Sequence, residues 1–153
     1  DERYVRASSP AQLWARLRRE ESAVDLSDQQ VWDLVASAYS RLPGSGDLVA
    51  AGELYRQNCL ACHGEQGKGD GVMARDLPAM GDHAGMGREA TRPPDFSDPA
   101  VLLGASPALL EGKIIRGGMG TGMPYWGPIF TDQQIQSLAM YLLSFQMNLE
   151  NNP

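Results

Sequence analysis

The chain has 153 residues, of which 42% are hydrophobic and 21% are charged. This size and composition are typical of one globular domain, or of one domain with an extension. The net charge of −6 at pH 7 argues against nucleic acid and anionic lipid as partners and favours docking on a basic or largely apolar surface. No run of about 18 apolar residues occurs, so no membrane-spanning segment is predicted.

Residues 1–46 are predicted to form a helical extension. A first short helix is expected over residues 10–19, with Ser9 as its cap and a proline at its first position. A second helix begins after Ser27, where Ser27-Asp28-Gln29-Gln30 reads as a capping box. The sequence Leu42-Pro43-Gly44-Ser45-Gly46 ends this helix and suggests a linker to the rest of the chain.

The extension resembles part of the chain's own C-terminal half. Ser9-Pro10-Ala11-Gln12-Leu13 matches Ser106-Pro107-Ala108-Leu109-Leu110, and Ser27-Asp28-Gln29-Gln30-Val31 matches Thr131-Asp132-Gln133-Gln134-Ile135. Two interpretations stay open. Capping boxes recur widely, so two capped amphipathic helices can resemble each other through shared helix chemistry alone. Alternatively, the extension is a truncated repeat of the C-terminal module.

A third helix is expected from Asp47, with its apolar residues at helical spacing. It leads directly into Cys59-Leu60-Ala61-Cys62-His63. Two cysteines three residues apart at a helix end place both thiols on one side of the backbone, where both can add to the vinyl groups of one porphyrin. A histidine directly after the second cysteine can then bind the iron. This spacing is the recognised attachment signal of a c-type haem.

Three other uses of the cysteine pair fit less well. Redox dithiols begin a helix in a strand–helix fold, whereas this pair ends a helix with no strand pattern before it. A zinc site needs four protein ligands, and the chain has only two cysteines. A disulfide between residues three apart closes a small, strained loop. The pattern therefore predicts one covalent haem.

The middle of the chain is rich in glycine and is expected to wrap around the haem. The run from Gly64 to Gly71 fits a chain that passes close to the haem edge, where side chains would collide. His83 lies in a polar stretch and is expected to be a solvated loop residue. The extended piece Pro93-Pro94-Asp95-Phe96 ends in a large aromatic ring that suits the cover of a flat apolar surface.

The C-terminal third predicts two helices joined by a loop with two thioethers. The first helix covers residues 107–116 and ends at Gly117-Gly118. The loop follows as Met119-Gly120-Thr121-Gly122-Met123-Pro124-Tyr125-Trp126. A last helix begins with the capping box at Thr131 and has an apolar face of residues at helical spacing.

Taken together, these motifs make residues 48–147 similar to the class I c-type cytochromes. The matching features occur in the family's order along the chain. They are Tyr55 four residues before the first cysteine, the Cys59-x-x-Cys62-His63 site, the Gly-x-Gly-Asp-Gly loop at 67–71, Pro94-Asp95-Phe96, Gly122-Met123-Pro124 followed by aromatic residues, and Leu138-x-x-Tyr141-Leu142.

The resemblance implies an all-α cytochrome c fold around one covalent haem c, with a cytochrome domain at 47–153 after a haemless extension at 1–46. The first domain helix would cross the last helix near Tyr55 and Tyr141. Thioether bonds to the two cysteines would hold the haem, and aromatic rings would flank it. The axial ligands of the iron would be His63 on one side and Met123 on the other. The residues expected at the haem are Cys59, Cys62, His63 and Met123, with Phe96 and Trp126 beside them.

Two positions depart from the family pattern, and one ligand has a rival. The family often has glycine eight residues before the first cysteine, where this chain has Ala51 and then Gly52. It also often has proline after Gly-Asp-Gly, where this chain has Val72. That difference leaves the carbonyl that orients His63 unidentified. Met119 competes with Met123 as sixth ligand, and the family motif favours Met123.

The function implied is electron transfer rather than enzymatic catalysis, because an iron with both axial positions filled by protein cannot bind a substrate. His/Met ligation raises the reduction potential. The chain would be a soluble carrier or the cytochrome domain of a respiratory or oxidoreductase complex, with redox proteins as donor and acceptor. The alternative is a haem enzyme or gas sensor with a displaceable sixth ligand. Since c-type haem is attached outside the cytoplasm and no signal peptide opens the chain, we expect a mature or trimmed periplasmic protein.

Overall fold

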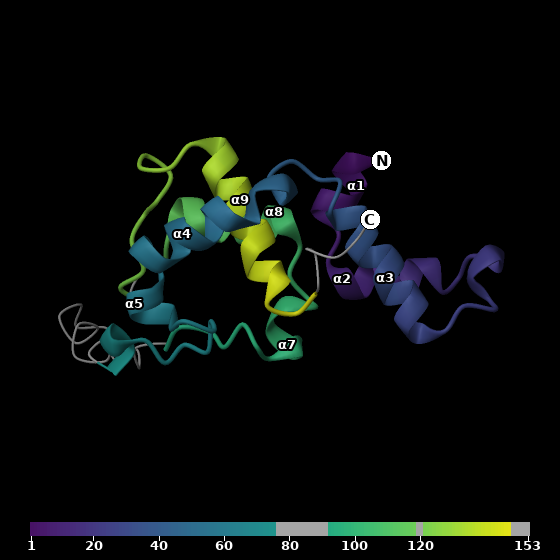
Figure 1. Cartoon of the computed structure of the whole chain (residues 1–153), viewed down its shortest axis with the longest axis horizontal. Helices are drawn as coiled ribbons and strands as arrows, with labels where there is room; N and C mark the ends of the chain where they lie inside the picture. Colours follow the sequence, from purple (N-terminus) through teal and green to yellow (C-terminus); the bar gives the residue numbers. More distant parts are fainter. Residues whose placement is uncertain (76–91, 119–120, 148–153) are drawn as a thin grey trace.

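The computed structural model describes residues 1–75, 92–118 and 121–147, and within these ranges the regular secondary structure is helical. Figure 1 shows the N-terminal helices at one end of an elongated molecule and the remaining helices grouped at the other. The helices are α1 (Glu2–Ala7), α2 (Pro10–Leu17), η1 (Glu21–Ala23), α3 (Asp28–Tyr39), η2 (Ser45–Asp47), α4 (Leu48–Asn58), α5 (Leu60–His63), η3 (Val72–Arg75), α7 (Pro99–Leu102), α8 (Pro107–Arg116) and α9 (Asp132–Ser144).

The predicted helix starts agree with the structure because local capping chemistry decides them. Ser27 and Thr131 both make complete capping boxes at the starts of α3 and α9, and Ser106 accepts a hydrogen bond from the Leu109 N–H at the start of α8. The helices α1 and α7 were not predicted, because segments of six and four residues carry too little periodicity to be recognised. None of the described helices combines the length and apolar character that crossing a bilayer requires.

The crossing of α4 and α9 forms the centre of the fold, as the family resemblance implied. The rings of Tyr55 and Tyr141 lie 5.4 Å apart between their centroids, and Ala51 is fully buried. A Cβ atom on Gly52 would lie 3.0 Å from Cε2 of Tyr141. Gly52 therefore provides the close approach at this crossing, one residue later than in the family pattern.

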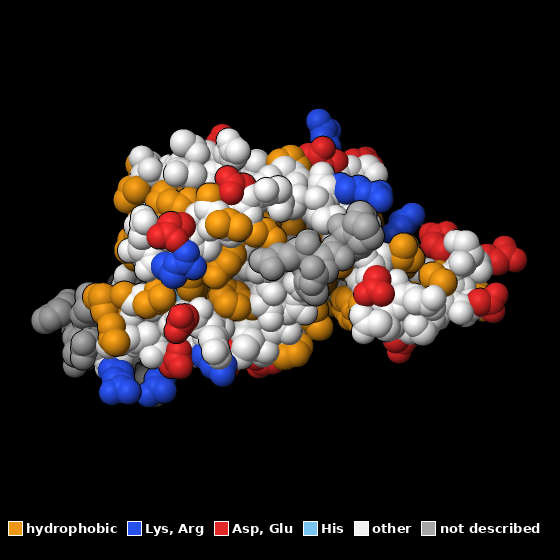
Figure 2. Space-filling view, viewed as in Figure 1, with side chains coloured by type: hydrophobic (Ala, Val, Ile, Leu, Met, Phe, Trp, Pro, Cys, Tyr) orange, Lys and Arg blue, Asp and Glu red, His pale blue; other side chains and the backbone are white. Residues whose placement is uncertain are grey.

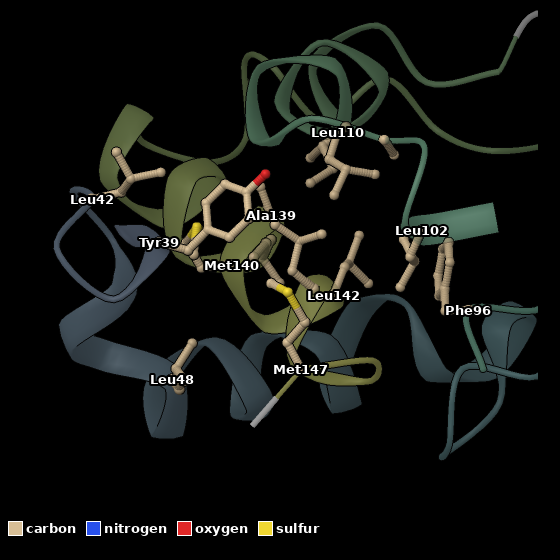
Figure 3. Packing of buried hydrophobic residues seen from close by; sticks show 14 of the residues in the cluster. Tyr39, Leu42, Leu48, Phe96, Leu102, Leu110, Ala139, Met140, Leu142 and Met147 are labelled. Carbon is tan, nitrogen blue, oxygen red and sulfur yellow. The ribbon is translucent and has the colours of Figure 1, made fainter. Parts of the chain in front are cut away.

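The N-terminal extension packs on the rest of the molecule. Leu13, Val35, Tyr39 and Leu42 belong to the same hydrophobic core as residues of α7, α8 and α9. Figure 3 shows the ring of Tyr39 near Met140 of α9, with Leu42 at the edge of the same cluster. The Tyr39 hydroxyl is buried and donates a hydrogen bond of 2.8 Å to the Ser8 carbonyl. The extension therefore has no separate hydrophobic core.

The linker predicted after α3 is itself packed against α9. Leu42 is buried, and a Cβ atom on Gly44 would lie 2.7 Å from the backbone of Gln136 and Ser137. Gly44 also has a φ of +89°, which glycine adopts without strain. The linker that the sequence suggested is thus a turn held against the helix beside it.

Deleting residues 1–46 is expected to lower the melting temperature by roughly 10 °C or more. Each large side chain that is fully buried contributes about 1.5–3 kcal/mol, and about 1 kcal/mol shifts the melting temperature of a domain this size by roughly 2–4 °C. Differential scanning calorimetry would measure the melting temperature. Binding of a hydrophobic dye would measure the apolar surface that the deletion exposes. An unchanged melting temperature in the shortened chain would show that the observed packing adds no stability.

Candidate functional site

The cysteine–histidine motif forms a sharp joint between two helices. Cys59 ends α4, where its N–H donates to the Tyr55 carbonyl at 2.8 Å. The short α5 follows and contains Cys62 and His63. Both thiols are free and half-buried, so the joint presents two unpaired cysteine side chains and one imidazole within five residues.

The glycine run packs behind this joint. The N–H groups of Gly69 and Gly71 donate to the carbonyls of His63 and Cys62 at 2.8 and 3.2 Å. A Cβ atom on Gly71 would lie 2.3 Å from the Ala61 carbonyl oxygen, so no other residue fits there. None of residues 64–71 lines the cavities described next. The run thus braces the motif from the side away from these cavities, and its path along the haem edge stays a prediction.

Two cavities of about 150 and 320 Å³ open in front of the motif. Leucine, isoleucine, valine and aromatic side chains line much of the larger cavity, and no Asp or Glu of the described segments lines either cavity. Because they share six lining residues, we treat them as one crevice. The shared residues are Cys59, His63, Pro94, Thr121, Met123 and Trp126.

One wall of the crevice is a stack of rings that contains His63. The imidazole lies 5.0 Å from the ring of Phe96, with 14° between their planes, and Phe96 stacks in turn on Phe145 at 6.4 Å. Phe96 is fixed through its backbone, because its N–H donates to the Gly67 carbonyl and its carbonyl accepts from the side chain of Gln146. Phe96 therefore supports the histidine as well as lining the larger cavity.

The methionine loop forms the opposing part of the crevice. The Thr121 hydroxyl donates to the Gly118 carbonyl at 2.9 Å and accepts from the Met123 N–H at 3.4 Å. The Gly118 N–H donates to the Met123 carbonyl at 3.2 Å. These bonds close the loop on itself and direct Met123 to a position where it lines both cavities.

Trp126 completes the crevice, and its ring stacks on Phe130 at 4.9 Å. Among the predicted site residues, Cys59, His63, Met123 and Trp126 line both cavities, while Cys62 lines the smaller one and Phe96 the larger one. Met119 and His83 lie outside the described residues, so the structure makes no comparison between Met119 and Met123.

Sequence reasoning missed several residues of the crevice. Thr121 was not singled out, although it stands in the predicted loop and braces Met123. Arg92 lines the smaller cavity and Lys113 the larger one, and each places a cation beside an otherwise largely apolar space. No local pattern marks these two residues, because only the tertiary fold brings them to the crevice.

Burial fixes the protonation of the groups at the motif. It lowers the pKa of the His63 imidazole to about 4, so the ring is neutral near pH 7 and keeps a lone pair for a metal. Burial, with a smaller contribution from Cys62, raises the pKa of the Cys59 thiol to about 11. Redox dithiols show the opposite shift, so Cys59 lacks the activated thiolate of that class.

The crevice fits a covalent c-type haem. It offers a largely apolar space, two thiols at one edge, and a neutral imidazole and a thioether among its lining residues, which are the donor types of His/Met haem sites. No group of three or more His, Cys, Asp or Glu that could hold a metal ion occurs in the described part of the chain. Nδ1 of His63 is buried and has no hydrogen-bond partner there, so the orienting carbonyl that the sequence left open remains unidentified.

The chain is similar to proteins of one known family. The Cytochrome c family profile matches residues 49–146. Cytochrome c55X of Paracoccus denitrificans is 31% identical over 113 residues, which are 72% of this chain and 88% of that protein. The cbb3-type cytochrome c oxidase subunit FixP of Azorhizobium caulinodans is 30% identical over 122 residues, 79% of this chain and 34% of that subunit.

Two further comparisons set limits on the likeness. Subunit CcoP of an Azospirillum cbb3-type oxidase is 28% identical over 74% of this chain, and the chain spans about a third of the length of these oxidase subunits. A chain of the reducing HAO-like protein complex of Kuenenia stuttgartiensis has the same fold, with a TM-score of 0.56 and 22% identity. The likeness covers 94% of this chain and 70% of that one.

Proposed function

This chain belongs to the cytochrome c family, and from that premise we propose that it is an electron carrier whose single haem c is held by Cys59 and Cys62 and ligated by His63 and Met123. The observation that carries the proposal is the shared lining of the crevice. Cys59 and His63 of the cysteine–histidine motif and Met123 of the distant methionine loop all line both cavities. When bound, the haem supplies an iron that alternates between two oxidation states.

The surrounding residues are suited to hold one haem geometry in both states. The ring stack of His63 and Phe96 supports the imidazole, and Thr121 braces the backbone of Met123. Side chains such as Leu102, Leu110 and Leu142 line the larger cavity and keep water away. A largely apolar site and a thioether ligand both favour the reduced, less charged iron and so raise the reduction potential.

For partners, we propose donor and acceptor proteins of a respiratory chain outside the cytoplasm. The support is that several relatives are subunits of cbb3-type cytochrome c oxidases, and that haem c is attached outside the cytoplasm. The chain would serve as a carrier or as the cytochrome domain of such a complex. Absorption spectra of the purified protein in both redox states test the haem and its ligands together. The ferric protein should show a sulfur-to-iron charge-transfer band, and its absence would reject the methionine ligand.

Thr121→Val is expected to weaken the methionine ligand without removing it. Valine keeps the shape of threonine but loses the hydroxyl that joins Gly118 and Met123. Loss of this bridge should lower the stability of the loop by roughly 1 kcal/mol. A denaturant titration that follows the sulfur-to-iron band should therefore show an earlier loss of the band. Thr121→Ser should behave like the native chain, and an equal midpoint in the valine variant would contradict the bridging role.

A further inference from the structure

Helix α8 joins the haem crevice to the methionine loop. Leu110 and Ile114 of this helix line the larger cavity. In its last turn, the carbonyls of Ile114 and Ile115 accept the N–H groups of Trp126 and Gly127 at 3.4 and 3.2 Å. These two residues lie just beyond Met123, so the position of α8 fixes where the methionine loop ends.

The same helix carries a buried carboxylate that lines neither cavity. Glu111 is 7% exposed and follows the cavity residue Leu110. Arg6 of α1 donates to it twice, from Nε to Oε1 at 3.1 Å and from Nη2 to Oε2. Among the described residues, no other side chain is bonded to Glu111. A buried charge that loses its partner is costly, so Arg6 favours this one placement of α8.

A second contact ties the extension to the chain segment just before α8. The Ala11 N–H of α2 donates to the Leu103 carbonyl, at the end of α7, at 3.0 Å. Leu102 beside it is fully buried and lines the larger cavity. Figure 1 shows α1 and α2 on the side of α8 that faces away from α4 and α5. The haem-facing wall of α7 and α8 is thus supported from behind by the extension.

We propose that Arg6 and Glu111 are a positioning pair that keeps the Met123 loop closed over the sixth position of the haem iron. This inference rests on the proposed function, in which Met123 is that ligand. Opening of the loop requires the backbone hydrogen bonds between its end and the carbonyls of Ile114 and Ile115 to loosen. The Arg6–Glu111 ion pair opposes movement of α8, the helix that carries these two carbonyls. The extension thereby favours a carrier with a closed iron over a protein that binds added ligands.

Imidazole binding to the ferric full-length protein directly measures the opening of the Met123 loop. At saturating imidazole, the observed rate reports how often Met123 leaves the iron. Arg6→Gln and Glu111→Gln should each raise this rate by roughly three- to tenfold, as expected when a coupled pair is broken. The double variant should add little to either single change. Arg6→Lys keeps the charge and should restore most of the native rate.

Tyr39→Phe is the matched control, because the hydrogen bond that it removes joins two residues of the extension, Tyr39 and Ser8. This variant should lower the melting temperature and leave the imidazole rate unchanged. The proposal is overturned if Arg6→Gln binds imidazole at the native rate, or if Tyr39→Phe accelerates binding in proportion to its lost stability. Equal rates in the native protein and in Met123→Ala would reject the ligand assignment, and the positioning role with it.

Discussion

Replacement of Met123 by alanine is expected to remove the sulfur-to-iron band of the ferric protein and to lower its reduction potential by roughly 0.1–0.3 V. Axial ligands set haem potentials over a span of about 0.8 V, and a thioether favours the reduced iron. Among the methionines that the structure describes, Met123 lines both cavities of the crevice. Spectroelectrochemistry of the purified variant would measure both changes in one titration.

The matched control for this change is Met73→Ala. Met73 lies in η3, is 46% exposed and lines neither cavity, so its loss should leave the spectrum and the potential unchanged. Met119→Ala tests the rival ligand. An unchanged spectrum in Met123→Ala, together with loss of the band in Met119→Ala, would show that the other sulfur of the loop binds the iron.

Loss of the haem is expected to unfold the middle of the chain. Replacement of Cys59 and Cys62 by serine prevents covalent attachment, and removal of haem from this variant leaves the crevice without its largest apolar surface. Any group that binds only the folded state stabilises that state. Hydrogen exchange should then show little protection between residues 64 and 128.

The extension gives this experiment an internal reference. Tyr39 and Val35 are fully buried and line neither cavity, so α3 should keep more protection than residues 64–128 in the haem-free chain. Uniform, cooperative protection across the whole haem-free chain would contradict the view that the haem acts as the core of this middle segment.

Local chemistry made most of the helices predictable. Each capping residue forms bonds within four positions of itself, and apolar spacing shows which face is buried, so α3, α8 and α9 begin where the sequence placed them. On α8, the apolar side chains of Leu109 and Ile115 are exposed, and Leu109 lines the larger cavity. Spacing alone does not show how wide the covered face is, because that width depends on the neighbouring elements.

The haem motif was predictable because its chemistry is confined to five consecutive residues. Other parts of the site depend on contacts between distant segments. The support of His63 by Phe96 joins positions on either side of the glycine-rich middle, and the Arg6–Glu111 pair joins residues 105 positions apart. No periodicity or capping signal encodes such pairs, so only the folded chain reveals them.

The surface charge also shows what composition leaves out. The chain is acidic overall, yet within the described ranges the charged residues that line the crevice, Arg92 and Lys113, are both cations. On the face shown in Figure 2, acidic side chains gather at the end formed by the N-terminal extension. A partner that approaches the crevice therefore meets cationic side chains there, which the net charge of −6 does not predict.

The reaction of the reduced protein with carbon monoxide tests the central claim most directly. If His63 and Met123 fill both axial positions, the absorption spectrum of the ferrous protein should stay unchanged under carbon monoxide at neutral pH. The Met123→Ala variant should bind the gas at once, and its main absorption band should shift. This variant shows that the assay can detect an iron with an open axial position. Rapid formation of a carbon monoxide complex by the native protein would contradict a closed electron carrier and favour a haem enzyme or gas sensor.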